Sequence, residues 1–281
     1  MRTIDAHVHL INVTDHDWYP GLKAWGDAVG VPGLYADFSL ADYRAGTERE
    51  VDGFVHVSAT TKPRAYLDET AWVDRLADEH ELDLAIIATV DPALGRDEML
   101  ADLEQQARSP RFRGLRILDG LEPESATADV VLGWLQERGL LFDLVATPDT
   151  MAAWLGVLER FPDLGVVLEH TGWPTATDDA GRAAWQEALR AFATSTPHLC
   201  KLSGLGMTTM DLSEASLRPW LEFAIDQLGW GRVAYGSNVP IETMAGSHQQ
   251  LLATLEAVVG EAGRAEQAGF WGANAADTYG L

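Results

Sequence analysis

The sequence predicts a single (β/α)8 barrel, the TIM-barrel fold, over all 281 residues. Short β-like runs alternate with amphipathic helical segments from end to end, and there are eight such runs. No linker, low-complexity tract or change of composition divides the chain, so we expect one domain, residues 1–281. A doubly wound open sheet is disfavoured because no glycine-rich dinucleotide motif follows the first run and no P-loop motif occurs.

The expected strands are apolar runs at residues 3–9, 53–59, 84–90, 112–118, 140–146, 165–171, 199–205 and 232–238. Helical periodicity is clear between them, for example in "TMAAWLGVLERF", where apolar residues recur at i, i+3/i+4 and i+7 spacing. Ser247 and Asp97 are the expected N-caps of two helices. Gly263 is expected to end the helix that Ser247 begins, and Gly139 to end another. The elements therefore follow one another in the order of a barrel.

The composition limits the function classes. The formal net charge is −23, which excludes nucleic acid as a partner because binding it requires a basic face. Cys200 is the only cysteine, so there is no disulfide framework and no cysteine-based zinc site. No apolar stretch is long enough to span a membrane, and the N-terminus lacks a signal-peptide core. We expect a cytoplasmic protein with a small-molecule substrate; whether it forms a homo-oligomer stays open.

The strongest local signal for a functional site is "DAHVH" in the first run. Strand alternation is expected to put Asp5, His7 and His9 on one face, so that the two imidazoles chelate one metal ion or flank one carbonyl group. His170 lies near the end of the sixth run, before a glycine-containing turn. Active sites of TIM barrels lie at the C-terminal ends of the strands. The three histidines are therefore expected to meet there.

Further candidates follow from their positions. Arg116, near the end of the fourth run, is suited to clamp a carboxylate or polarise a carbonyl, or to form a salt bridge at the rim. Asp143 is expected to face inward, where it would contact substrate or act as a displaced base, and Lys201 to be an interior ion-pair partner. Trp18 and Tyr19 lie in the long first loop, which is expected either to cover the mouth and contact substrate or only to pack on its neighbours.

Six motifs carry a family resemblance: "DAHVHL", "FRGLRIL", "FPDLGVVLEHTGWP", "CKLSGLGM", "RVAYGSNVP" and "GANAADTYGL". In order and spacing they resemble the amidohydrolase-2 family, and most closely its lactonase-like branch, which includes 2-pyrone-4,6-dicarboxylate lactonase and sugar lactonases. The resemblance covers essentially the whole chain. It implies a hydrolase acting on ester or lactone bonds, with His7, His9, His170 and Asn238 at the catalytic positions.

Asn238 departs from the family pattern, because the hydrolytic members carry an aspartate there that activates water. An amide has no ionisable proton acceptor near neutral pH, so Asn238 cannot be a general base. In a hydrolysis, His170 or Asp143 would then take the proton. The alternative is non-hydrolytic chemistry in the same pocket, such as decarboxylation, isomerisation, elimination or cyclisation. A non-catalytic ligand-binding barrel is a third reading, which three imidazoles around one mouth disfavour.

The resemblance to the lactonases implies no obligatory metal cofactor. The alternative is one divalent ion such as zinc, held by His7, His9 and His170. The two-metal form of the superfamily is disfavoured, since "FRGLRIL" offers neither a lysine nor a glutamate to bridge two ions.

Overall fold

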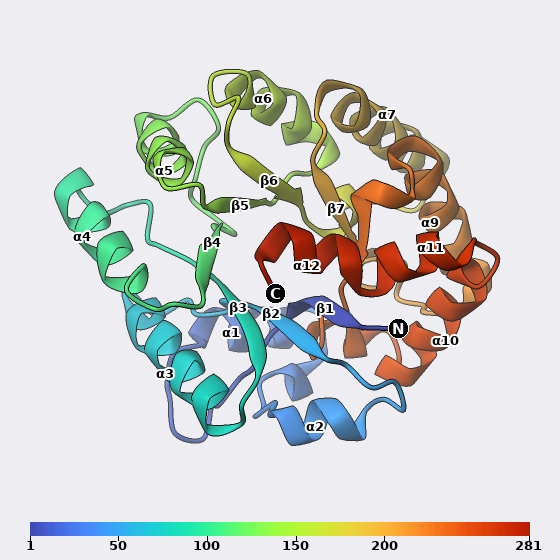
Figure 1. Cartoon of the computed structure of the whole chain (residues 1–281), viewed down its shortest axis with the longest axis horizontal. Helices are drawn as coiled ribbons and strands as arrows, with labels where there is room; N and C mark the ends of the chain where they lie inside the picture. The colour runs from blue at the N-terminus through green and yellow to red at the C-terminus, as the bar shows by residue number, and fades with distance from the viewer.

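The computed structural model describes residues 1–281 and confirms the predicted (β/α)8 barrel (Figure 1). Eight parallel strands follow one another in sequence order around the barrel: β1 (Ile4–Val8), β2 (Gly53–Val57), β3 (Asp83–Ala88), β4 (Phe112–Arg116), β5 (Leu141–Leu144), β6 (Gly165–Leu168), β7 (Leu199–Leu202) and β8 (Val233–Tyr235). Each strand overlaps a predicted run but stops before the end of that run. The last residues of the runs leave the sheet and form the loops at the mouth of the barrel.

Helices surround the strands. The α-helices are α1 (Pro20–Ala28), α2 (Leu40–Ala45), α3 (Ala65–Glu79), α4 (Arg96–Gln106), α5 (Ala126–Glu137), α6 (Pro148–Leu158), α7 (Asp179–Ser195), α8 (Gly206–Thr209), α9 (Glu214–Leu228), α10 (His248–Val259), α11 (Arg264–Ala268) and α12 (Asn274–Tyr279). Shorter helical turns are η1 (Pro32–Leu34), η2 (His170–Gly172), η3 (Trp230–Arg232), η4 (Ile241–Met244) and η5 (Gly269–Ala273). None of the helices combines the length and the apolar character needed to cross a membrane.

Two of the four helix-end predictions are confirmed. The Ser247 side chain caps α10, and Gly139 follows α5 with a φ of +62°, a conformation that glycine adopts without strain. The prediction for Asp97 is wrong, because Gly95 is the N-cap of α4 and Asp97 lies in its first turn. Gly263 does not end α10 but is the N-cap of α11.

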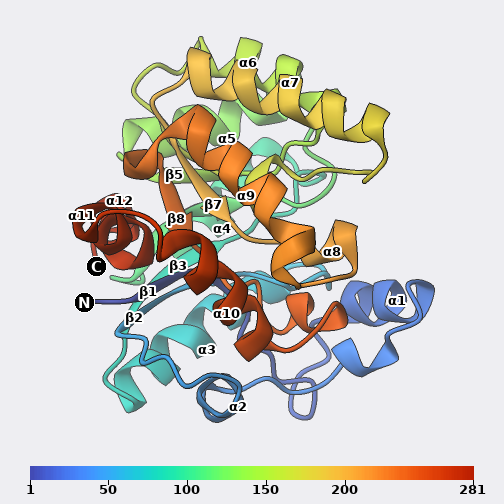
Figure 2. The same ribbon diagram turned by 90° about the vertical axis from the view of Figure 1, so that its right-hand side faces the viewer.

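The two ends of the barrel are closed differently. Helix α12 and both chain termini lie over one end, whereas α1 and α8 lie at the opposite end (Figures 1 and 2). Arg113, at the start of β4, donates to the carbonyl of Tyr279 at 2.8 Å, so α12 sits over the N-terminal ends of the strands. The buried Tyr279 packs there with Ile4 and Ala6 in the cluster that fills the barrel. Only the C-terminal ends of the strands are left to form a site.

A bulge in β1 breaks the expected alternation. Asp5 pairs with Phe54 and Val8 with His56, so three steps along β1 oppose two along β2. Ala6 packs in the interior, while the Asp5 carboxylate accepts a hydrogen bond from Tyr43 of α2, outside the sheet, at 2.8 Å. The prediction that Asp5 shares a face with the histidines is therefore wrong.

The same carboxylate supports the contact between the end of β1 and residues 237–239, which we call the seam and which closes the barrel. Asp5 also accepts hydrogen bonds from the backbone N–H groups of His7 (3.1 Å) and Ser237 (2.8 Å). Beside it, the Asn238 N–H donates to the His7 carbonyl at 2.8 Å, and the His9 N–H donates to the Val239 carbonyl at 3.0 Å. The chain after β8 is thereby held against the end of β1, which puts Asn238 beside the histidine pair.

Removing the Asp5 carboxylate should destabilise the whole barrel. Asp5→Ala leaves three buried donors without an acceptor, so we expect the free energy of unfolding to fall by at least about 3 kcal/mol. Urea denaturation measures the difference. Tyr43→Phe, which removes one of the three hydrogen bonds, should cost about 1 kcal/mol. Asp163→Ala, an exposed control, should stay within about 0.5 kcal/mol, and an Asp5→Ala protein as stable as this control would contradict the account.

Candidate active site

The three predicted histidines meet at the C-terminal ends of the strands. The Nε2 atoms of His7 and His9 lie 3.2 Å apart, and the ring centroids of His7 and His170 lie 4.6 Å apart. All three side chains are buried. Nδ1 of His9 is 2.7 Å from the Val57 carbonyl, which fixes the orientation of that ring. The structure therefore brings residues from the start and from the second half of the chain into one cluster.

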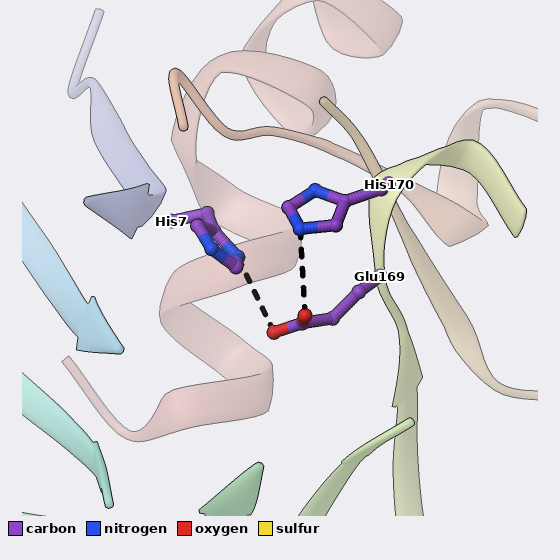
Figure 3. A group of neighbouring side chains, drawn as sticks. All are labelled: His7, Glu169 and His170. Atoms are coloured by element: carbon purple, nitrogen blue, oxygen red, sulfur yellow. Dashed lines mark ion pairs between the residues drawn. The ribbon is translucent and has the colours of Figure 1, made fainter. Parts of the chain in front are cut away.

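Glu169, which the sequence reasoning missed, lies between two of these histidines (Figure 3). Its Oε1 atom is 3.3 Å from Nδ1 of His7, and its Oε2 atom is 3.5 Å from Nε2 of His170. Arg116 and Lys201 each place a positively charged nitrogen 3.8 Å from the carboxylate. The side chain is fully buried, yet neither oxygen accepts a hydrogen bond from the protein. Such a carboxylate is available to a proton, a water molecule or a cation.

The backbone explains why Glu169 and His170 face the same interior. Val167 packs inside the barrel, so alternation also turns Glu169 inward and would turn His170 outward. The strand ends at Leu168, however, and His170 and Thr171 adopt φ values of +52° and +57°. This left-handed turn brings the imidazole back into the site. The inward position of Glu169, two residues after Val167, was readable from the sequence.

Gly204 makes room for His170. The φ of Gly204 is +70°, and a Cβ atom there would lie 2.5 Å from Cγ of His170. Nδ1 of the same ring lies 3.1 Å from the Ser203 hydroxyl. The ring is thus held between the end of β6 and the loop after β7.

Lys201 is confirmed as an interior ion-pair partner. Its ammonium group donates to Asp143, whose two oxygens also accept from the Tyr279 hydroxyl at 3.0 Å each. The same ammonium group lies 3.3 Å from Nδ1 of His7. Because the acceptors of Asp143 are taken up by Lys201 and Tyr279, the predicted roles of Asp143 as substrate ligand or base have no support in this geometry.

Burial sets the protonation states of the cluster. It lowers the pKa of His9 to about 3, with Arg116 adding to the effect, and lowers the pKa values of His7 and His170 well below the usual range, with Lys201 and Arg116 contributing. The imidazoles are therefore neutral at neutral pH. Burial also raises the pKa of the Glu169 carboxyl to about 7, against the opposing pull of Arg116 and Lys201. A group with this pKa can take up and release a proton near neutral pH.

Arg116 connects the cluster to a cavity. The side chain is buried at the end of β4, donates to the Ser58 carbonyl, and lines a cavity of about 300 Å³ over the ends of β2, β3 and β4. Hydroxyl and carboxylate groups, including those of Thr60, Asp91 and Asp119, line the same space. The structure thus shows Arg116 facing Glu169 in an ion pair at 3.8 Å, while its contact with a ligand stays a prediction.

Trp18 and Tyr19 lie away from the histidine cluster. Both are buried in the packing of the first loop, where His16 stacks on Trp18 with ring centroids 3.7 Å apart and Trp72 of α3 meets the Trp18 edge. The structure brings neither residue against the histidines, and their contact with substrate stays a prediction.

A metal ion would find a different donor set from the one expected. His7, Glu169 and His170 each offer a ligand atom, and these atoms lie within 4.8 Å of one another. Glu169 thus takes the place predicted for His9. The unpartnered carboxylate oxygens of Glu169 and the two neutral imidazoles fit a divalent ion.

Substitution of Gly204 tests the packing of His170. Gly204→Ala would drive a methyl group into the imidazole, so we expect a destabilisation of at least about 3 kcal/mol and loss of the histidine geometry. Gly139→Ala is the matched control, because Gly139 also has a positive φ but nothing within 4 Å of the added carbon. It should cost only about 1–2 kcal/mol. Equal effects of the two substitutions on urea denaturation would rule out this role of Gly204.

Comparison with known proteins agrees with the fold. The chain matches the amidohydrolase family over residues 4–281. It is 29% identical over 255 residues to an L-fucono-1,5-lactonase of Burkholderia ambifaria, covering 86% of this chain and 82% of that protein. A crystal structure of an amidohydrolase from Burkholderia multivorans with bound zinc is 26% identical, covers 100% of both chains and superposes with a TM-score of 0.85.

A further structure shares the fold. It belongs to a Pseudomonas putida protein proposed to be a 2-pyrone-4,6-dicarboxylic acid hydrolase, at 18% identity and a TM-score of 0.73, covering 99% of this chain and 97% of that chain. The family match over nearly the whole length confirms the resemblance inferred from the six motifs. The chain belongs to the amidohydrolase family.

Proposed function

We propose that this protein is an enzyme that hydrolyses a lactone of a small hydroxylated acid. The observation that carries the proposal is Glu169, a buried carboxylate with no hydrogen-bond donor, placed between His7 and His170. The similarity to an L-fucono-1,5-lactonase supports a hydrolase that acts on lactone or ester bonds.

Different residues of the site would stabilise the oxyanion and transfer the proton during hydrolysis. Arg116 and an N–H group of a neutral imidazole are placed to donate hydrogen bonds to the lactone carbonyl, which stabilises the oxyanion that forms on attack. Glu169 takes a proton from the attacking water and becomes a carboxylic acid. When the ring C–O bond breaks, it returns that proton to the leaving oxygen, so the product is an open hydroxy acid. Glu169 replaces His170 and Asp143, the proton acceptors expected from the sequence.

The cavity favours a neutral, hydroxylated ring. Two cations line it, and of these Lys62 pairs with Asp17. The charge of Arg116 is opposed by Glu169 at 3.8 Å, although N–H groups of Arg116 stay free to donate to a carbonyl. Asp91 and Asp119 add negative charge, which opposes a dianionic substrate. Hydroxyl and carboxylate groups are the partners that sugar hydroxyls prefer, and about 300 Å³ is at the small end of ligand pockets. A sugar lactone therefore suits the site better than a pyrone dicarboxylate.

The proposal includes operation without an obligatory metal. Two buried cations, Lys201 and Arg116, already balance the two buried carboxylates of Asp143 and Glu169, and a divalent ion would add two more positive charges. If His7, Glu169 and His170 did hold such an ion, it would polarise the carbonyl and lower the pKa of bound water.

Replacing Glu169 should remove the hydrolysis while keeping the fold. Glu169→Gln has the same shape but cannot accept a proton, so we expect kcat on aldonolactones to fall about 10³-fold. In the wild type, kcat should fall about tenfold for each pH unit below a pKa of about 7, because the base must be ionised. A pH-stat assay over a panel of aldono-1,4- and 1,5-lactones measures both effects.

The matched control is Glu69→Gln, a buried glutamate of α3 outside the cluster, which should keep wild-type kcat. A folded Glu169→Gln protein that retains more than about a third of the wild-type kcat would exclude Glu169 as the base. Absence of lactone turnover in the wild type itself, across the panel, would favour the non-hydrolytic alternative.

A further inference from the structure

Glu242 is a buried carboxylate beside Asn238 with no positively charged partner. It lies in η4, is 1% exposed, and its oxygens accept hydrogen bonds from the Gly206 backbone N–H at 2.7 Å and from Nδ2 of Asn238 at 3.1 Å. Burying a carboxylate without a cation is unfavourable, and burial raises the pKa of Glu242 to about 7. Because burying the Glu242 carboxylate lowers the stability of the fold, we expect a functional role that offsets this cost.

The contact with Glu242 decides which way the Asn238 amide points. An asparagine side chain donates through its nitrogen and accepts through its oxygen, and it is Nδ2 of Asn238 that lies 3.1 Å from Oε2 of Glu242. The NH2 group of Asn238 is therefore turned toward Glu242, and the amide oxygen is its free end. The side chain also favours the protonated form of His9, as an acceptor oxygen does. A backbone hydrogen bond of 2.9 Å from Glu242 to the Asn238 carbonyl fixes the turn between them.

We propose that Glu242 is a positioning residue, which holds the Asn238 side chain with its amide oxygen toward His9 and the mouth of the barrel. An uncharged acceptor at that point can take a hydrogen bond from the attacking water and orient it. The inference rests on the proposed hydrolysis and deepens it: the functional unit after β8 is the Asn238–Glu242 pair and not Asn238 alone.

The pair explains why an aspartate would not suit position 238 in this chain. Asn238→Asp alone would put two buried carboxylates in contact, and like charges at that distance cannot both ionise. Combined with Glu242→Gln, the same change keeps every hydrogen bond with the roles exchanged. The new glutamine would accept from Gly206 through its oxygen and donate to the new aspartate through its NH2 group.

The test compares Asn238→Asp, Glu242→Gln and the double variant, with Glu187→Gln of the exposed face of α7 as control. In Glu242→Gln two NH2 groups would face each other, so the Asn238 amide turns over and presents a donor to the mouth. We expect kcat for lactone hydrolysis to fall about 10–100-fold in each single variant, with KM changed less than about threefold. The double variant should recover to within about tenfold of the wild type, which a purely structural role would not produce.

The account is overturned if the double variant is no more active than the weaker single variant, or if Glu242→Gln keeps wild-type kcat. Thermal midpoints of the same proteins separate this inference from the proposed function. If the wild type hydrolyses no lactone, the proposed function fails. The Asn238–Glu242 pairing is then tested by the thermal midpoints alone. A double variant more stable by several degrees than either single variant supports the pairing, whereas additive losses overturn it.

Discussion

The arrangement of this site depends on one electrostatic constraint: two cations and two carboxylates are buried together inside the barrel. Lys201 is neutralised mainly by Asp143, and Arg116 faces Glu169. Burying a charge is costly unless it is paired, so each of these side chains constrains the position of the next. Asp143 accepts hydrogen bonds from both Lys201 and the Tyr279 hydroxyl. Glu169 is therefore the carboxylate of the two whose oxygens accept no hydrogen bond from the protein. The same positive charges, with burial, keep the neighbouring imidazoles neutral.

The chemistry lies just beyond the strands, where the backbone leaves regular geometry. His170 and Asn238 both have positive φ values, +52° and +54°. Non-glycine residues adopt this conformation rarely, and such strain is concentrated at functional sites. At His170 the turn redirects a side chain that strand alternation alone would place outward. The seam between β1 and the chain after β8 then holds Asn238 against His7 with a backbone hydrogen bond, so the fold and the site share the same contacts.

Much of this was predictable from the sequence, because the signals are local. The eight strands follow from apolar runs, and the convergence of His7, His9 and His170 follows from their places near strand ends. The orientation of Asp5 was not predictable, since a bulge depends on register with β2. Glu169 was missed because strand alternation lets only one of two neighbouring residues face inward, and His170 was assigned to that side. In the structure both side chains face inward. Asn238 was recognised as a departure from the family pattern, but its hydrogen-bond partner was not. The contact with Glu242 arises in a turn that no periodicity describes.

The central claim is that water opens a lactone at this site through the chain's own residues. Turnover of a sugar lactone in ¹⁸O-labelled water, by protein stripped of metal with a chelator and checked by elemental analysis, tests it most directly. The account predicts one ¹⁸O atom in each molecule of hydroxy acid and an unchanged kcat after chelation. A product without the label, or a kcat that is lost on chelation and restored by zinc, would contradict it.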